Sequence, residues 1–340
     1  MADRSHPPFP LPLLVTGITG VVGYHALAHF QSRYPGRAIG IRQADDGRMA
    51  GPGIVACDAE DRDGIARLFD RHQFGSVLNC AGNCALKSCE LDPAMARRVN
   101  VEGVDNLLRE TVAGGARLVH LSVDLVFAGR DGGGYTEDDP PDPVTVYGKT
   151  MVQAEQLVLE RDPGACILRI SLPMGLSLNG HAGAIDWISS RFRHNRPATL
   201  YYDEVRTPTY CDCLNSVCET MLAGRWRGLY HAGSPRPMSL FQIAQVINRV
   251  GGYDPRLLLG MPRRHAGPIP PRAGNVSMDS GKLIRTLGCD PFLPWPLDER
   301  LHPLARDWHH HRPADEIGSS EAVARLLARR PADAIDQAAG

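Results

Sequence analysis

Short apolar runs alternate with amphipathic segments along the first half of the chain. The apolar runs, which predict strands, cover residues 11–17, 37–42, 75–82, 116–127 and 165–173. The segments with helical periodicity cover residues 21–33, 63–72, 94–113 and 147–160. Strands and helices that alternate in this way are typical of a parallel sheet with helices on both faces. We therefore predict an α/β fold built on a doubly wound parallel sheet.

Beyond residue 175 the pattern becomes less regular. Glycine and proline are frequent, and helical segments at 239–250, 280–288 and 320–330 are separated by irregular stretches. Such a region suits a smaller lobe that shapes a substrate pocket. The predicted organisation is a sheet domain over residues 1–175, an α/β substrate-binding lobe over 176–300 with some interleaved segments, and a partly disordered extension over 301–340.

The charge balance and the N-terminal segment exclude several classes of partner. The 340 residues include 37 Lys and Arg against 38 Asp and Glu, a net charge of −1, which gives no reason to expect a nucleic-acid partner. The first apolar run is broken by prolines and is too short for a signal peptide or a membrane span. We expect a cytoplasmic protein without a membrane partner.

Cysteines and histidines give no metal-binding pattern. The nine cysteines lack matched Cys-x2-Cys pairs, which predicts reduced and mostly buried thiols. Three adjacent histidines, residues 309–311, cannot all face one metal ion from a regular element. We expect them in a solvated tail, and we expect no metal site.

Three glycines follow the first predicted strand. Gly17, Gly20 and Gly23 stand in "VTGITGVVG", where the strand ends and the next helix begins. In a dinucleotide-binding turn the first glycine permits the tight bend, the second lets backbone amides approach a pyrophosphate, and the third lets helix and sheet pack closely. A plain strand–helix turn is the alternative, but the position at the first βα crossover favours a Rossmann-type NAD(P)-binding domain.

The end of the second strand indicates which dinucleotide is bound. An acidic residue there favours NAD(H), whereas a basic one accommodates the 2′-phosphate of NADP(H). Arg42 holds this position, although Asp45 and Asp46 follow closely. We favour NADP(H) over NAD(H), and we expect Asp58, which ends a further apolar run, to meet the adenine.

Four motifs in order carry a family resemblance: "TGITGVVG", "NCAG" from Asn79 to Gly82, "LSVDLVFAG" at 121–129 and "VYGKTM" at 146–151. The sequence resembles the extended short-chain dehydrogenases/reductases, and most closely their dTDP-4-dehydrorhamnose reductase branch. "ELDPAMARRVNVEG" with Asn100, "RTPTYCD", "GLYHAGS" and "PPRAGNVSMD" extend the likeness.

The resemblance implies a catalytic triad that this chain keeps only in part. In the family a hydroxyl residue, a tyrosine and a lysine carry out the proton chemistry beside the nicotinamide. The tyrosine matches Tyr147, but the hydroxyl position is Val123 and the lysine position is Met151. A cation near the phenol normally lowers the tyrosine pKa from about 10 toward neutral pH, and methionine cannot do this. Ser122, beside Val123, is our candidate for the missing hydroxyl.

Other side chains are candidates for the missing cation and acid. Lys149 lies about 200° around the helix from Tyr147 and is expected on the surface. Lys87, in the loop after a parallel strand, is the better candidate for the cation, although it is equally interpreted as a solvated loop lysine. Asp124 matches a general acid of related dehydratases. Cys84 has a lowered pKa if a cation lies close, or is a small buried residue.

The wider binding site is assigned in two groups. The dinucleotide is expected to contact Gly17, Thr19, Gly20, Val21, Val22, Gly23, Arg42, Asp58, Asn79, Cys80, Ala81, Gly82, Asn100, Tyr147, Met151 and Leu172. The substrate is expected to contact Cys84, Arg206 and Arg272. The two arginines are assigned because a guanidinium binds phosphate through two parallel hydrogen bonds.

Two functions agree with these residues. The first is an NAD(P)-dependent reductase, or an epimerase or dehydratase, that acts on a nucleotide-linked keto sugar with Tyr147 as acid/base. The second is a catalytically silent subunit that keeps the binding sites but has no turnover. We consider it because a regulatory subunit of methionine adenosyltransferase resembles the same branch. The resemblance also implies a homodimer that pairs through the helices bearing the tyrosine.

Overall fold

The main sheet has seven parallel strands. The computed structural model describes residues 9–47, 49–130, 132–313 and 318–329. Within them the strand order is β11-β6-β5-β4-β1-β2-β3, and every neighbouring pair is parallel. The strands are β1 (Leu13–Val15), β2 (Ala38–Arg42), β3 (Ile54–Ala56), β4 (Ser76–Asn79), β5 (Arg117–Val123), β6 (Cys166–Ile170) and β11 (Gly228–Ala232). The predicted doubly wound parallel sheet is confirmed.

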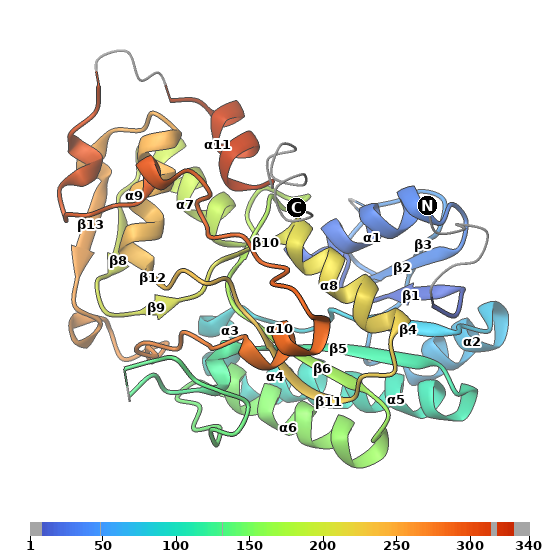
Figure 1. The fold of residues 1–340 in the computed structure, drawn as a ribbon. Coiled ribbons are helices and arrows are strands. Elements are labelled where there is room, and N and C mark those ends of the chain that lie inside the picture. Colours follow the sequence, from blue (N-terminus) through green and yellow to red (C-terminus); the bar gives the residue numbers. More distant parts are fainter. Residues whose placement is uncertain (1–8, 48, 131, 314–317, 330–340) are drawn as a thin grey trace.

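Helices cover both faces of this sheet (Figure 1). On one face α1 (Val21–Arg33) packs against α8 (Cys211–Ala223), and on the other α5 (Gly103–Gly114) lies between α2 (Arg62–His72) and α6 (Val146–Arg161). Alternate residues of a strand point to opposite faces, so Leu13 and Val15 join one buried cluster and Leu14 joins the other. The two faces of the sheet therefore have separate hydrophobic cores.

The helix expected over residues 94–113 is interrupted by a π-helical turn. The segment consists of α4 (Pro93–Arg97), the π-helix η1 (Arg98–Glu102) and then α5. The Asn100 side chain in this turn accepts a hydrogen bond from the Asn83 amide at 2.7 Å and donates one to Thr150 Oγ1 at 2.9 Å. π-Turns occur frequently at functional sites. Here the turn links the loop after β4 to α6.

In the described part of the chain, the second lobe contains three two-stranded sheets and several helices. Its strand pairs are β7 (Pro173–Met174) with β10 (Thr209–Tyr210), β9 (Val205–Arg206) with β12 (Met238–Ser239), and β8 (Ala198–Tyr201) with β13 (Leu258–Met261). Its helices are α7 (Ala184–Arg193), α9 (Leu240–Val250) and α11 (Ser320–Leu327), whereas α10 (Gly281–Leu287) packs beside β11 at the edge of the main sheet. The chain returns from this lobe to the main sheet through α8 and β11, so residue 175 is not a simple cut between two bodies.

The described part of the C-terminal extension packs on the second lobe. Tyr210 Oη donates to the Leu326 carbonyl at 3.1 Å, and Trp295 Nε1 donates to the Leu327 carbonyl at 2.8 Å. His309 is 2% exposed and lies 3.1 Å from Gln245 Nε2 through its Nδ1. The expectation of a solvated tail is therefore wrong for His309. A contact with α9, which the local sequence does not indicate, explains its burial.

The described residues contain no group of three His, Cys, Asp or Glu side chains arranged to hold a metal ion. All nine cysteines are free, and six of them are buried. None of the helices in these ranges combines the length and apolar composition needed to span a bilayer.

Candidate dinucleotide and catalytic site

The glycine turn forms a tight backbone cradle at the end of β1. Gly17 has a φ of +65°, and a Cβ on it would lie 2.5 Å from the Cys80 carbonyl oxygen. A Cβ on Gly23 would collide with the Gly17 carbonyl. No side chain caps the N-terminus of α1, which begins after Gly20. Free amides at a helix N-terminus, reached through a turn without side chains, suit a pyrophosphate.

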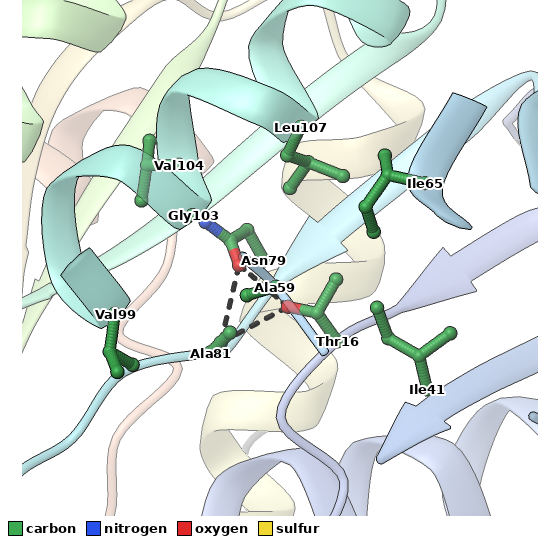
Figure 2. A pocket seen from close by; sticks show the side chains of 10 residues that line it. All are labelled: Thr16, Ile41, Ala59, Ile65, Asn79, Ala81, Val99, Gly103, Val104 and Leu107. Atoms are coloured by element: carbon green, nitrogen blue, oxygen red, sulfur yellow. Dashed lines mark hydrogen bonds between the residues drawn. The ribbon is translucent and has the colours of Figure 1, made fainter. Parts of the chain in front are cut away.

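Thr16 joins the ends of β1 and β4 (Figure 2). Its Oγ1 donates to Asn79 Oδ1 at 2.6 Å and accepts from the amides of Cys80 and Ala81 at 3.0 Å. Asn79 Nδ2 in turn lies 2.9 Å from His120 Nδ1. The sequence assignment missed Thr16, although its position directly before Gly17 was a usable signal. This network holds the loop of residues 80–82 against the glycine turn.

A small cavity of about 10 Å³ lies beside this network. Figure 2 shows Ile41, Ile65 and Leu107 converging on it, with Thr16 and Asn79 at its polar side. The cavity opens at the carboxyl ends of β1, β2 and β4, where the strand order reverses between β1 and β4. Ligands of doubly wound sheets bind at this kind of switch point.

Arg42 and Asp58 both hold the loop that follows β2. The Arg42 guanidinium donates to the carbonyls of Met49 at 2.6 Å and Gln43 at 2.8 Å, and Asp58 accepts from the Ala44 amide at 2.9 Å. Both side chains thus organise the segment where an adenosine ribose would lie. Their direct contact with a dinucleotide stays a prediction.

Tyr147 lies in the first turn of α6 in an apolar environment. Thr145 caps the helix by accepting from the Gly148 amide at 2.9 Å. Tyr147 is 6% exposed and Met151, one turn later, 3%. Both belong to a cluster of apolar side chains with Leu125, Val126, Phe127, Tyr135, Ala273, Val276 and Met278. The cation that acts on Tyr147 is Arg206, whose charge is already paired with Asp124.

The pKa of Tyr147 follows from this environment. Burial raises the pKa of Tyr147 well above its usual value of 10, the nearby Cys84 and Asp124 raise it further, and Arg206 opposes them. The phenol is therefore protonated at neutral pH.

Asp124 and Arg206, assigned to different roles from the sequence, form one buried ion pair. Arg206 donates from Nε to Asp124 Oδ2 at 2.5 Å and from Nη2 to Oδ1. Ser171 also donates to Oδ2, at 2.5 Å. Burial opposes the charge of Arg206, but Asp124 outweighs it and raises the pKa of the guanidinium. Each group thus has its charge matched beside Tyr147.

Ser122 belongs to a second buried network. Its Oγ donates to Glu155 Oε1 at 2.5 Å, and Arg169 donates to both Glu155 oxygens at 2.8 and 2.7 Å. Successive strand residues point to opposite faces, so Ser122 points away from the side on which Val123 lies. Glu155 was missed in the sequence assignment, although it follows Tyr147 and Met151 at four-residue spacing.

Lys87 and Cys84 lie at the rim of this region. Lys87 is exposed on α3 (Leu86–Leu91), which packs against α6, and Lys149 is exposed on α6 itself. Cys84 is exposed as a residue, yet desolvation raises the pKa of its thiol. The direction is opposite to that expected of a thiol beside a cation.

The remaining assigned residues lie in three places: the glycine turn, the segment after β6 and the second lobe. Thr19 and Val22 are half-buried in the glycine turn and Val21 is buried. The Leu172 carbonyl after β6 accepts from the Thr209 amide at 3.0 Å. Arg272 lies 3.7 Å from Glu204 and stacks over the Tyr201 ring at 4.8 Å.

The fold and the cradle define a Rossmann-type protein of the short-chain dehydrogenase class. The chain belongs to the RmlD substrate binding domain family, which it matches over residues 11–296. The family resemblance predicted from the motifs is confirmed.

Curated relatives cover most of the chain. The β subunit of methionine adenosyltransferase 2 from Rattus norvegicus is 28% identical over 87% of this chain and 88% of its own. dTDP-4-dehydrorhamnose reductase from Mycolicibacterium smegmatis is 29% identical over 76% of this chain and 80% of its own.

Solved structures share the fold. UDP-glucose 4-epimerase from Thermus thermophilus, complexed with NAD, has a TM-score of 0.74 at 21% identity and covers 88% of this chain and 99% of its own. dTDP-4-dehydrorhamnose reductase from Bacillus anthracis, in complex with NADP, has a TM-score of 0.72 at 19% identity and covers 83% and 95%.

Proposed function

We propose that the protein is an NADPH-dependent reductase of a keto group on a nucleotide-linked sugar, with Tyr147 as the proton donor. The observation that carries this proposal is the position of Tyr147, buried in the first turn of α6 against the residues that follow β5.

Methionine in place of the family lysine, at Met151, favours reduction over the other reactions of the class. Reducing a carbonyl requires a proton donor, and the phenol is in that form at neutral pH because burial raises its pKa. Epimerases and dehydratases begin by oxidising an alcohol, for which the tyrosine must accept a proton. Without a lysine near Tyr147, the phenolate needed for that step is disfavoured.

The cradle supports a nicotinamide dinucleotide as cofactor. The turn at Gly17 to Gly23 fits a pyrophosphate because no side chain caps the first amides of α1, and because a side chain at Gly17 or Gly23 would collide with the backbone that forms the turn. When bound, NADPH would supply the hydride for the reduction. Arg42 at the end of β2 favours the 2′-phosphate, and the complexes with NADP and with NAD among the structural neighbours agree with a dinucleotide of either type.

The substrate class follows from the second lobe. The names of the relatives include dTDP-4-dehydrorhamnose reductase and UDP-glucose 4-epimerase, both of which act on nucleotide-linked sugars. Arg272, at the edge of the lobe, is the residue we assign to the diphosphate. Arg206 supports the site by neutralising Asp124.

A second candidate is a regulatory subunit without turnover. The observation that favours it is Met151, whose side chain replaces the lysine in an apolar cluster. The β subunit of methionine adenosyltransferase 2, among the relatives, carries a name of that kind. Losing one such electrostatic group commonly costs about a hundredfold in rate, so an uncompensated site is slow.

The experiment measures binding and turnover separately. We expect calorimetry to show NADPH binding, and we expect NADPH consumption with a nucleotide-linked 4-keto sugar. Tyr147→Phe should lower turnover by about 10²-fold or more and lower NADPH affinity far less, because the proton donor is lost while the aromatic ring remains. Equal turnover of this variant would refute the role of Tyr147, and tight binding without any consumption would favour the regulatory subunit.

Met151→Lys distinguishes a weakened enzyme from a rewired one. If lysine raises turnover steeply, the cation is what the natural site lacks. If turnover falls, the methionine belongs to a different mechanism. Met151→Leu is the matched control, since it keeps the apolar cluster.

We also propose a homodimer that pairs through α5 and α6. Val112 and Leu159 are exposed apolar residues on these helices, but ion pairs of Asp105 with Arg109 and Arg161 occupy the same surface. Sedimentation velocity tests the dimer, and Leu159→Glu should dissociate it.

A further inference from the structure

The helix that carries Tyr147 begins against a carboxylate from another element. Glu90 on α3 accepts a hydrogen bond from the Val146 amide through Oε1 at 2.7 Å. Val146 is the first residue of α6 and directly precedes Tyr147. Glu90 and Val146 are 56 positions apart in the sequence, so no local pattern indicates this contact.

A carboxylate suits this place because α6 cannot supply one itself. The first amides of a helix have no partner within the helix, and their partial positive charge favours an anion. Thr145 accepts from the Gly148 amide, but the first turn of α6 contains no acidic residue. A side chain at Gly148 would collide with the Leu125 carbonyl, so the helix has no room for a capping-box glutamate at its third position. Glu90 provides the acceptor from outside the helix.

Glu90 is half-buried and is presented by an anchored helix. Its neighbour Cys89 is fully buried in the apolar cluster that contains Tyr147, and Cys89 Sγ donates to the Asn83 carbonyl at 3.3 Å. Helix α3 also packs against α6. The carboxylate is therefore fixed in the place from which it holds the first amide of α6.

The backbone of Tyr147 is also held from its other side. The Tyr147 carbonyl accepts from Thr150 Oγ1 at 2.8 Å, and Thr150 Oγ1 accepts from Asn100 Nδ2 at 2.9 Å. Asn100 belongs to the π-turn η1. The Tyr147 side chain packs among apolar residues, so the direction in which the phenol points depends on how the first turn of α6 is placed.

We propose that Glu90 is a positioning residue for the reduction: by holding the Val146 amide, it fixes the first turn of α6 and aims the Tyr147 phenol at the substrate carbonyl. Glu90 acts through Val146 and needs no contact with substrate or cofactor. Misplacing a reacting group by about 1 Å can cost about a hundredfold in rate. This inference deepens the proposed function and rests on it for the role of Tyr147. The placement of α6 requires no turnover, so the two ideas can fail separately.

The first test compares turnover in Glu90→Ala and Glu90→Gln. Alanine removes the acceptor, and we expect kcat for a nucleotide-linked 4-keto sugar to fall about tenfold or more, with KM and NADPH affinity changed less than about threefold. Glutamine keeps an oxygen that can accept from the Val146 amide, so kcat should return to within about threefold of the natural value. Asp61→Ala is the matched control, because Asp61 caps α2 by accepting from the Gly64 amide at 2.9 Å. It should lower stability and leave kcat unchanged.

Amide hydrogen exchange tests the same contact without turnover. In the free protein, the peptide that covers residues 146–151 should exchange faster in Glu90→Ala than in the natural protein, because the first turn of α6 then opens more easily. Its exchange should be unchanged in Glu90→Gln and in Asp61→Ala.

Three results would overturn the proposal: unchanged exchange in Glu90→Ala, an unchanged kcat when Glu90→Ala is made in an active protein, or a Glu90→Gln variant as slow as Glu90→Ala. An equal fall of kcat in Asp61→Ala would also overturn it, because a general loss of stability then explains the rate. Faster exchange in Glu90→Ala of a protein without turnover would uphold the positioning of Tyr147 by Glu90 and reject the reductase.

Discussion

The proposed dinucleotide end and the proposed catalytic end of the site are built by different means. At the end of β1 the backbone makes the site: Gly17 and Gly23 leave no room for a side chain, and Thr16 ties the turn to β4. At the end of β5 side chains make it: Asp124 is paired with Arg206, and Tyr147 shares an apolar cluster with Met151. A backbone site tolerates few substitutions, whereas a side-chain site can be rewired within the same fold.

The largest effect is expected from a substitution in the glycine turn. Gly17→Val should weaken NADPH binding about a hundredfold or more and cost about 1–3 kcal/mol of folding free energy, because the side chain meets the Cys80 carbonyl and φ is positive. Calorimetry and urea unfolding measure both. Gly114→Ala is the matched control, since a Cβ there meets nothing within 4 Å. Normal NADPH affinity in Gly17→Val would contradict a backbone cradle.

The next largest effect is expected from a substitution in the buried pair of Arg169 with Glu155. Arg169→Met should lower the free energy of unfolding by about 3–5 kcal/mol, because it leaves the Glu155 carboxylate buried and unpaired. Arg256→Met, which removes an exposed pair with Asp254, should cost less than about 1 kcal/mol. Similar losses in the two variants, measured by urea unfolding, would show that the buried network does not anchor α6.

Acid should destabilise both ends through buried histidines. Burial lowers the pKa of His120, beside Asn79, to about 4, and burial with Arg169 lowers that of His231 to about 4. The unfolded chain binds these protons first as pH falls below 6.5, so stability is lost between pH 6.5 and 4. At pH 5 one fully buried histidine accounts for about 2 kcal/mol.

His120→Gln tests this assignment. Urea unfolding at about pH 7.5 and about pH 5 should show a smaller acid loss in His120→Gln than in the natural protein. His181→Gln, at an exposed position, should leave the loss unchanged. If the acid-induced loss of unfolding free energy is unchanged in both variants, His120 is not the group that titrates.

The smallest effect is expected from a substitution at Arg42, which tests whether NADPH is preferred over NADH. Arg42→Gln should weaken NADPH binding about tenfold and NADH binding much less, since only NADPH carries the 2′-phosphate. If NADPH and NADH lose affinity equally, Arg42 acts only through its loop contacts with the carbonyls of Met49 and Gln43.

Local rules predicted the regular first half and the glycine turn. Helix α1 has the predicted bounds, Val21–Arg33, because apolar periodicity and the preceding glycines mark it. Helices α7 and α8 were not predicted, since their segments follow glycine-rich or short irregular stretches. The break at η1 was also missed, because it depends on contacts of Asn100 with Asn83 and Thr150.

The catalytic end was less predictable because its pairs are distant in sequence. Asp124 and Arg206 are 82 positions apart, and Ser122 and Glu155 are 33 apart. No local pattern reveals that such groups contact each other. The identities of Tyr147 and Met151 were visible, but the direction of the Tyr147 pKa depended on what surrounds the phenol.

The contacts of α11 bear on the order in which a growing chain can fold. The carbonyls of Leu326 and Leu327 accept the buried donors of Tyr210 and Trp295. Six of the seven main strands are complete by residue 170, so much of the sheet can assemble while synthesis continues. These two contacts form only once α11 has been synthesised, so a chain halted before residue 320 would leave the donors of Tyr210 and Trp295 without these partners.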